Sequence, residues 1–356
     1  MTIKETPKVS VIMPVYNVEP HLRECLDSIV NQVLDDIEIV CINDGSTDNS
    51  LSILEEYRQV DGRITIISQE NRGLSASRNV GMDIARGDYI HFMDSDDILR
   101  EDALGKLFSL AKKNSLDVVY FDATVFFDSE ELKKSHGVFG SSYSYIREHT
   151  YRGVMTGKSM FVQMSENKEY RPSMCMQLIN RNFLNNNNLR FYEGIYHEDQ
   201  PFNFLCMMKA QKVSHLGEPF FKRRIRSGSI VTTEKGYKHF YGYFISYTLI
   251  LKYAFISNIS GDVAAQTIRL LENIRNNLVW MHKESADWFN SMSEVEQYIF
   301  EYIAAKPAKL MSAESEIQNL RDQIETLNTQ IAEIYTSKSW KLGNKLAGIY
   351  RKIFRK

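Results

Sequence analysis

The sequence of 356 residues has few cysteines and no close pair of them. Its four thiols show no CxxC spacing, so neither a disulfide framework nor a zinc ribbon is indicated. They stand at Cys25, Cys41, Cys175 and Cys206. Reduced thiols in a cytoplasmic protein are the default interpretation of such scattered cysteines.

Charge of one sign is not in excess. Lys and Arg number 43 and Asp and Glu 45, which gives a formal net charge of -2 at pH 7. This balance excludes a globally basic nucleic-acid binder, and we expect no nucleic-acid partner. Apolar residues at 43% and charged residues at 25% are typical of a soluble globular protein.

Long hydrophobic runs are also missing. The N-terminus, MTIKETPKVS, has no apolar core of the kind that a signal peptide needs. The most hydrophobic long stretch, residues 241–259, is interrupted by Ser246, Lys252 and Asn258. This pattern favours a buried, aromatic-rich helix over a transmembrane helix.

The first 125 residues alternate between strand and helix patterns. Predicted strands cover residues 9–13, 37–42, 64–67 and 89–93, and Pro14 is expected to end the first of them. Helical spacing of apolar residues follows each of the first three strands. Strands separated by helical segments of about a dozen residues predict βαβ units and a mostly parallel sheet covered on both faces.

Two further segments precede the tail. Residues 126–235 lose the alternation, and we expect an irregular lobe there that is laid over the sheet and completes the same domain. Residues 236–309 carry Tyr, Phe, Leu and Ile at helical spacing and predict a helical region.

The tail predicts two kinds of association. Residues 310–337 hold a heptad seam with Ile at a and Leu at d in its later part, which favours a parallel coiled coil and a homodimer. The alternative is a helix packed on its own domain.

Residues 338–356 contain seven Lys or Arg and no acid, interleaved with aromatic and aliphatic residues. A basic amphipathic helix on an anionic membrane surface fits this composition, and a solvated tail is the alternative.

Polar residues gather where the predicted strands end. Tyr16-Asn17 follows the first strand, Asp44 the second and Asp94-Ser95-Asp96-Asp97 the fourth. Ligands of open α/β sheets bind at the carboxyl ends of the strands. Asp94 and Asp96 can turn toward one hard cation, so they are candidate ligands of Mg²⁺ or Mn²⁺. Such acids can instead cap the next helix, a role that we expect for Asp97.

Three motifs then occur in order within roughly the first 110 residues: PKVSVIMPVYNVEPHLRECLDSIVNQ, EIVCINDGSTDNS and ENRGLSASRNVGMDIARGDYIHFMDSDD. Together they resemble the family 2 glycosyltransferases of the GT-A fold, of the bacterial surface-polysaccharide type. Weaker similarity continues into HEDQPF at 197–202 and RRIRSGSI at 223–230. The resemblance implies a GT-A (Rossmann-like) sheet and an inverting, metal-assisted transfer from a nucleotide-diphosphate sugar, with UDP as the expected nucleotide.

The resemblance also implies a nucleotide-sugar site. Tyr16 would stack on the base and Asp44 would accept a hydrogen bond from it, while arginines would contact the diphosphate. Asp94 would hold the ribose and help with the metal, for which Asp96 would be the principal ligand. The predicted site comprises Pro14, Tyr16, Asn17, Asp44, Asn71, Arg72, Arg78, Asp94, Ser95, Arg226 and Ser229. The alternatives are a turn aromatic at Tyr16 and a surface helix residue at Arg78.

An inverting transfer needs a base that deprotonates the acceptor hydroxyl. By resemblance we assign this role to Asp199, with Glu198 and His197 orienting the base or binding acceptor. Alternatively, Glu198 and Asp199 merely begin the helix that Pro201 opens, where acids favour the positive end of the helix dipole. Both interpretations can hold together.

One segment departs from the family pattern. Where relatives often carry a Trp-Asn-Lys run, residues 172–178 read Pro-Ser-Met-Cys-Met-Gln-Leu. The acceptor contacts of such relatives therefore cannot be transferred to this chain.

The leading hypothesis is a hexosyltransferase that extends a surface glycan or a lipid-linked oligosaccharide in the cytoplasm, at the inner face of the membrane. One alternative is a non-catalytic coiled-coil scaffold with a vestigial donor site. Another is a nucleotidyltransferase, which would need a Gly-rich phosphate loop after the first strand. That position reads PVYNVEP and has no glycine.

Overall fold

The computed structural model describes residues 6–136, 145–230, 232–285 and 287–305. The first elements are β1 (Val9–Val15), α1 (Glu19–Val30), β2 (Ile37–Asn43), α2 (Ser50–Val60), β3 (Ile64–Ser68), α3 (Leu74–Ile84), β4 (Tyr89–Phe92), β5 (Ile98–Leu99), α4 (Ala103–Asn114), β6 (Val118–Phe127) and α5 (Glu130–His136). The later ones are α6 (Gly157–Glu166), η2 (Met174–Met176), β7 (Gln177–Asn180), α7 (Arg181–Asn186), α8 (Asp199–Lys209), β8 (Val213–Ile225), α9 (Tyr237–Ile256), α10 (Gly261–Glu284), α11 (Asp287–Asn290) and α12 (Glu294–Ala305). Residues as far as Phe300 form one compact unit.

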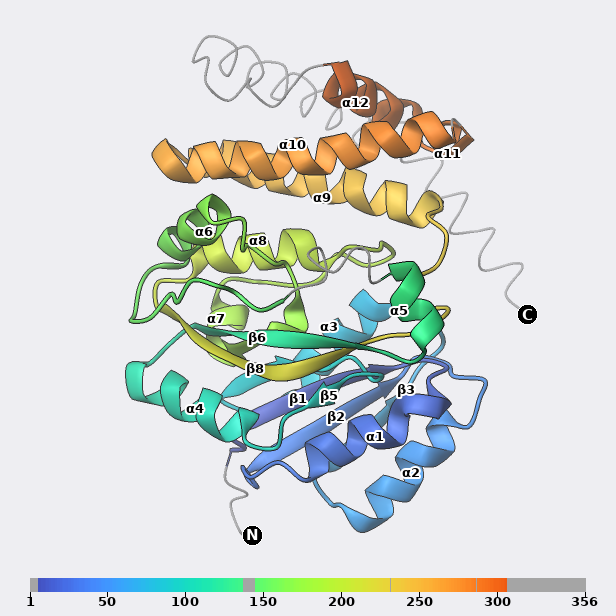
Figure 1. Cartoon of the computed structure of the whole chain (residues 1–356), viewed down its shortest axis with the longest axis vertical. Helices are drawn as coiled ribbons and strands as arrows, with labels where there is room; N and C mark the ends of the chain where they lie inside the picture. The colour runs from blue at the N-terminus through green and yellow to red at the C-terminus, as the bar shows by residue number, and fades with distance from the viewer. Residues whose placement is uncertain (1–5, 137–144, 231, 286, 306–356) are drawn as a thin grey trace, which may run out of the picture. The chain divides into compact units, whose positions relative to one another are not determined.

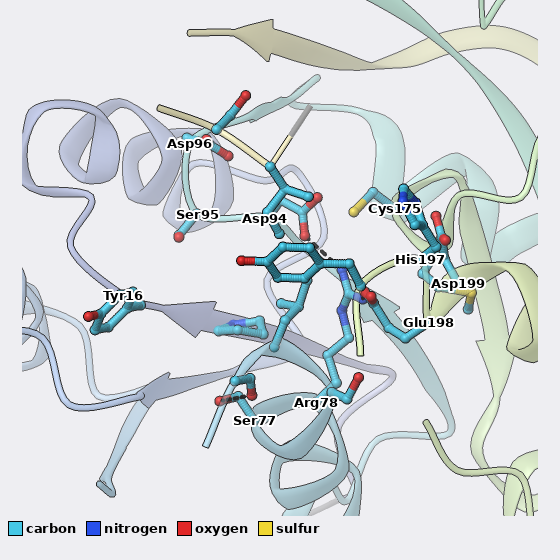
Figure 2. Close-up of a pocket in the computed structure, with 18 of the residues that line it drawn as sticks. Tyr16, Ser77, Arg78, Asp94, Ser95, Asp96, Cys175, His197, Glu198 and Asp199 are labelled. Carbon is cyan, nitrogen blue, oxygen red and sulfur yellow. Dashed lines mark hydrogen bonds and ion pairs between the residues drawn. The ribbon is translucent and has the colours of Figure 1, made fainter. Parts of the chain in front are cut away.

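The strands form one sheet in the order β3-β2-β1-β4-β7-β6-β8-β5. The first four strands of this order are parallel, as their βαβ connections require. β7 runs antiparallel between β4 and β6, whereas β6 and β8 are parallel. The prediction of a mostly parallel α/β sheet is confirmed. β1 and β4 end at a pocket that Tyr16 and Asp94 line (Figure 2).

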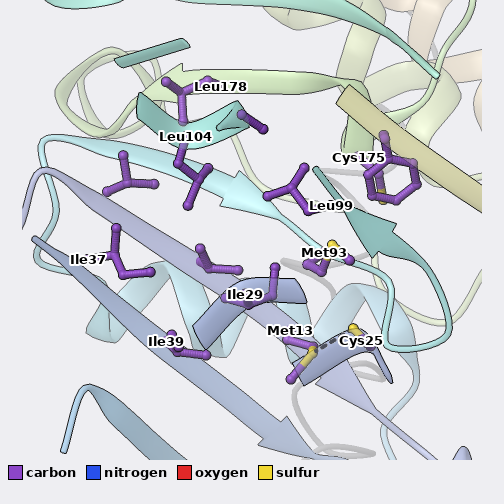
Figure 3. Close-up of a cluster of buried hydrophobic side chains, with 14 of the residues drawn as sticks. Met13, Cys25, Ile29, Ile37, Ile39, Met93, Leu99, Leu104, Cys175 and Leu178 are labelled. Atoms are coloured by element: carbon purple, nitrogen blue, oxygen red, sulfur yellow. Dashed lines mark hydrogen bonds between the residues drawn. The ribbon is translucent and has the colours of Figure 1, made fainter. Parts of the chain in front are cut away.

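Helices cover both faces of the sheet. β1 illustrates this, because it carries apolar side chains on both of its faces. Met13 belongs to the hydrophobic cluster that includes Leu22 and Ile29 of α1. Its neighbour Ile12 points to the other face, where α3 packs so closely that a Cβ on Gly81 would lie 2.3 Å from the Ile12 Cγ2 atom. Figure 3 shows part of the first face. Fully buried strands of this kind are expected of a parallel sheet with two helical layers.

The cysteines belong to this interior. All four are buried free thiols, and the Cys25 Sγ lies 3.5 Å from the Met13 Sδ between α1 and β1 (Figure 3). Buried thiols behave as small apolar side chains, which agrees with the absence of any disulfide or zinc spacing.

Two expectations about strands are wrong. β1 does not stop at Pro14 but continues to Val15. β4 ends at Phe92, so β1 has only β2 beside it at Pro14, an edge position where the missing N–H is tolerated. Residues 126–235 are not an irregular lobe either, because β7 and β8 complete the same sheet. Sequence periodicity missed them because β7 is short and β8 carries polar residues along its length.

Further helices pack against the part of the sheet that holds β6 and β8. Figure 1 shows α6 and α8 between the sheet and the pair α9 and α10. None of the described helices is long and apolar enough to cross a membrane. The predicted coiled coil and basic tail, residues 310–356, lie outside the described residues.

Candidate active site at the carboxyl ends of the strands

One cavity of about 1050 Å³ opens at the carboxyl ends of β1, β2 and β4. Helices α3, α8 and α9 and the end of β8 supply the remaining walls. Every residue of the predicted site lines it: Pro14, Tyr16, Asn17, Asp44, Asn71, Arg72, Arg78, Asp94, Ser95, Asp96, Glu198, Asp199, Arg226 and Ser229. The fold therefore brings the predicted donor, metal and base residues together, and their individual roles remain predictions.

The loop between β3 and α3 is held by Asp44. Its Oδ1 accepts hydrogen bonds from Gln69 Nε2 at 2.7 Å and from the Arg72 amide at 2.9 Å. Its Oδ2 accepts one from the Gly73 amide at 2.8 Å. Gly73 has φ +88°, a conformation that L side chains rarely adopt. Asp44 thus places Asn71 and Arg72 at the pocket wall.

Tyr16 and Asn17 form the rim at the end of β1. Tyr16 is 49% exposed, so its side chain is accessible to a flat ligand, and Figure 2 shows it across the pocket from Asp199. Asn17 has φ +47° and its Oδ1 accepts from the Thr47 amide at 2.8 Å. Asn tolerates this left-handed backbone, and the bond ties the turn after β1 to the loop after β2.

Arg78 joins two carboxylates that lie far apart in the sequence. From α3, its Nη1 donates to Glu198 Oε1 at 2.6 Å and its Nη2 to Asp94 Oδ1 at 2.9 Å (Figure 2). Its side chain is only 4% exposed, so the alternative of a surface helix residue is wrong. Burial lowers the pKa of Arg78, but Asp94 and Glu198 raise it more, so the guanidinium stays charged.

Asp96 is paired with the segment after β8. Its Oδ2 accepts from Arg226 Nε at 2.5 Å, and its backbone carbonyl accepts from Arg224 Nε at 2.8 Å. The Arg224 amide donates to Asp97 Oδ1 at 2.7 Å. The expectation that Asp97 caps the next helix is therefore wrong, since α4 begins at Ala103 after the N-cap residue Asp102.

The carboxylate oxygens of Asp94 and Asp96, just after β4, suit a hard cation that also binds phosphate. Asp94 and Asp96 each engage an arginine through one oxygen, and a carboxylate has two oxygens with about four lone pairs. Burial raises the pKa of Asp94, but Arg78 and Arg223 hold it below its usual range, so it remains an anion. Among the described residues, no group of three or more His, Cys, Asp or Glu could hold a metal alone. Mg²⁺ characteristically takes one or two carboxylates and completes its shell with phosphates and water.

Asp199 is the first residue of α8, as the helix-start interpretation predicts. Burial and then Glu198 raise its pKa to about 7, while Arg78 and Arg223 act in the opposite direction. Its carboxylate has no hydrogen-bond partner among the residues that the structure describes. A carboxylate with a pKa near neutrality and free oxygens can accept a proton from a substrate.

Sequence reasoning missed several residues of the pocket. Arg223 lines it and donates a hydrogen bond to the Tyr145 hydroxyl. Cys175, in the segment that departs from the family pattern, lines the pocket and helps to lower the pKa of Asp94. His239 and Tyr243 reach it from α9. Arg223 stands in the RRIRSGSI motif, but the α9 residues had no local signal, since they follow Asp199 by about 40 positions.

These features define a class, an α/β protein of the GT-A type whose pocket at the strand ends is lined by carboxylates and arginines. A similar fold occurs in Staphylococcus aureus TarS 1–349 in complex with UDP-GlcNAc, with a TM-score of 0.59 at 20% sequence identity. That likeness covers 83% of this chain and 79% of that one.

Sequence comparisons give a second likeness, over no more than about two thirds of the chain. Residues 10–179 match the model of glycosyl transferase family 2. Glycosyltransferase GlyA of Streptococcus pneumoniae is 37% identical over 232 residues, which cover 64% of this chain and 32% of that protein. Putative glycosyltransferase EpsH of Bacillus subtilis is 36% identical over 227 residues, 64% of this chain and 63% of that one. Over these residues the chain is similar to family 2 glycosyltransferases.

A more distant relative is named for its activity. Poly(ribitol-phosphate) beta-glucosyltransferase of Bacillus spizizenii is 34% identical over 218 residues, which cover 58% of this chain and 30% of that protein. The matched region of this chain thus spans between about a third and about two thirds of the length of these relatives.

Proposed function

We propose that this chain is an inverting, metal-dependent glycosyltransferase that moves a sugar from a UDP-sugar to a hydroxyl of a growing surface glycan or lipid-linked oligosaccharide. One observation carries the proposal. The cavity that holds the donor and metal candidates also holds Asp199, a carboxylate without a protein partner in the described chain.

The donor side is supported by the aromatic rim and by the bound ligands of a structural neighbour. Tyr16 offers an exposed aromatic side chain, and Asn71 and Arg72 supply polar and cationic groups to the same pocket. TarS has been crystallised with UDP and with UDP-GlcNAc. UDP is accordingly the nucleotide that we assign to this pocket.

Asp96 and Asp94 would hold Mn²⁺ or Mg²⁺, which would neutralise the charge of the departing nucleotide diphosphate. Arg226, paired with Asp96, brings a further cation to the same wall. Ser229 lies on the turn after it, where its hydroxyl lies 3.1 Å from the Thr232 Oγ1. These groups would bind and orient the diphosphate.

Asp199 would take the proton of the acceptor hydroxyl. The hydroxyl oxygen then forms a bond to the anomeric carbon while the bond from that carbon to the diphosphate oxygen breaks. Attack opposite the leaving group inverts the anomeric configuration. Arg78 keeps Glu198 beside Asp199 and Asp94 at the donor, so one buried cation connects the two halves of the reaction.

The acceptor and location are proposed from relatives and from the tail. The name of the Bacillus spizizenii relative gives poly(ribitol-phosphate) as its acceptor, which supports a polymeric acceptor for this chain. The heptads of residues 310–337 support a homodimer, and the basic tail supports peripheral contact with the cytoplasmic face of the membrane.

Nucleotide release from UDP-, GDP- and dTDP-sugars, with Mn²⁺ and with EDTA, tests the reaction. We expect release from a UDP-sugar that EDTA abolishes, and that Asp96→Ala and Asp199→Asn each reduce by at least about a hundredfold. Asp83→Asn is the matched control, because Asp83 is an exposed acid of α3 that pairs only with Arg190 in the described chain. If wild type releases no more nucleotide than Asp96→Ala does and neither exceeds the background without protein, the scaffold is favoured. Equal release by two active proteins would instead remove Asp96 as the metal ligand.

A further inference from the structure

We propose that His239 of α9 is a positioning residue, which holds the turn Tyr196–Asp199 in the conformation that presents Asp199 to the acceptor. The inference rests on the proposed function, in which Asp199 is the base. The inference gives α9, a helix outside the matched residues 10–179, a function in the active site.

The turn before Asp199 is strained. His197 has φ +62°, a left-handed backbone that a non-glycine residue adopts at a cost of about 1 kcal/mol or more. It stands two residues before Asp199, and α8 begins directly after Glu198. A strained residue at this place needs surrounding contacts that hold it. Arg78 of α3 holds Glu198, and the ring of His197 is held by residues of α9.

His239 makes the central contact. Its Nδ1 lies 3.0 Å from His197 Nε2, and the Tyr243 ring stacks on the His197 ring with centroids 4.1 Å apart and planes 20° apart. A single proton between two ring nitrogens forms this bond, so the rings must not both be cations. Burial, then His239 and Lys235, lower the pKa of His197 to about 3, which keeps that ring neutral in ordinary buffers.

The same face of α9 also holds the backbone of the turn. A Cβ on Gly242 would lie 2.1 Å from the Tyr196 carbonyl oxygen, so only glycine permits this approach. The Ser246 hydroxyl donates to the His197 carbonyl at 3.3 Å. Positions 239, 242, 243 and 246 share one face at helical spacing, so one rigid helix contacts both the side chain and the backbone of the turn.

The prediction separates positioning from binding. In the full chain, His239→Leu should lower the rate of UDP release from the preferred UDP-sugar by about ten- to a hundredfold, because small displacements of a reacting group have effects of that size. The dissociation constant for UDP, measured by calorimetry, should change less than about twofold, since the contacts of His239 described above are with the turn and not with the predicted donor residues. Gly242→Ala should behave in the same way.

Two variants make the test specific. His239→Asn places an amide close to the position of Nδ1 and should recover most of the rate, which a merely structural role would not require. Thr248→Ala is the control on the same helix, because the Thr248 hydroxyl donates to the Ile245 carbonyl of α9 itself. Melting temperatures of all variants identify any that do not fold.

The outcomes are distinct. No UDP release by wild type would overturn the proposed function, and this inference with it. An active wild type with an unchanged rate in folded His239→Leu and Gly242→Ala would overturn the inference alone. Equal losses of rate and UDP affinity, with no recovery in His239→Asn, would also overturn it and would indicate general damage to the pocket.

Discussion

At the scale of single residues, the site depends on how burial and neighbouring charges act on a few carboxylates. Asp94 keeps a pKa below its usual range because Arg78 and Arg223 outweigh its burial. Asp199 has its pKa raised to about 7, because for this residue burial and Glu198 outweigh the same cations. One acid thus stays ionised at the donor while the other can exchange a proton near neutrality, which is the separation that acid–base chemistry needs.

The pH dependence of the rate follows from Asp199. Only the deprotonated carboxylate can act as base, so UDP release should rise about tenfold per pH unit below pH 7 and level off above it. Stopped assays between pH 5 and 9 measure this profile. A flat profile with full activity at pH 5 would contradict the assignment of Asp199.

The stability of the fold should also depend on the titration of Asp199, but it should fall as the pH rises, whereas the rate of UDP release should increase. The pKa of Asp199 is about 7 in the folded protein and 3.8 in the unfolded chain, so between these values the folded state binds more protons. The contribution of Asp199 to stability is therefore present below about pH 4 and is lost as the pH rises to 7. We expect Asp199→Asn to melt at a higher temperature than wild type at pH 8, with a smaller difference at pH 5. Equal melting temperatures at both pH values would argue against the raised pKa.

Arg78 permits a stability prediction with an internal control. Arg78→Met would leave Glu198 buried without its cation, and breaking a buried pair in this way costs about 3–5 kcal/mol. Arg190→Met removes an exposed pair with Asp83 and should cost less than about 1 kcal/mol. Urea unfolding of both variants gives the two free energies. Similar values for the two would show that the Arg78 bridge is not formed in solution.

At the scale of elements, the accuracy of prediction depended on the distance over which each contact is made. β1 to β4 and their helices could be predicted because apolar runs and helical spacing are local. The bridge from Arg78 to Glu198 spans 120 positions, and the contact of His239 with His197 spans 42. Such pairs leave no local pattern. They depend on β7 and β8, which the local pattern does not indicate as strands. They also depend on α9, which the pattern predicts as a helix but without its contacts.

The β3–α3 loop gives a prediction at this scale. Gly73 sits at φ +88° at the start of α3, so Gly73→Ala should cost about 1–2 kcal/mol and weaken UDP binding through the displaced Arg72. Gly105 lies inside α4 with open space where a Cβ would stand, so Gly105→Ala should instead stabilise the protein by up to about 1 kcal/mol. Chemical unfolding and UDP calorimetry measure both effects. Stabilisation by both substitutions would remove the loop-anchoring role of Asp44.

At the scale of the whole molecule, the seam of residues 310–337 predicts assembly. An Ile and Leu heptad pattern of between three and four repeats can hold two chains together without the catalytic domain. Deleting residues 310–334 should therefore convert a dimer to a monomer in light scattering, with UDP release unchanged. A dimer that survives this deletion would place the interface on another surface, and a monomeric wild type would favour the helix packed on its own domain.

The basic tail predicts where this assembly works. Seven Lys or Arg among aromatic and aliphatic residues in 338–356 combine apolar insertion with attraction to anionic headgroups, at about 1 kcal/mol for each cation near the surface. A dimer would present two such tails, so that two weak anchors act together. Wild type should float with vesicles that contain phosphatidylglycerol but not with neutral vesicles, and deletion of residues 338–356 should abolish flotation. Deletion of residues 310–334 should weaken it, because a single tail remains per particle. Flotation that persists without the tail would place the membrane contact elsewhere in the chain.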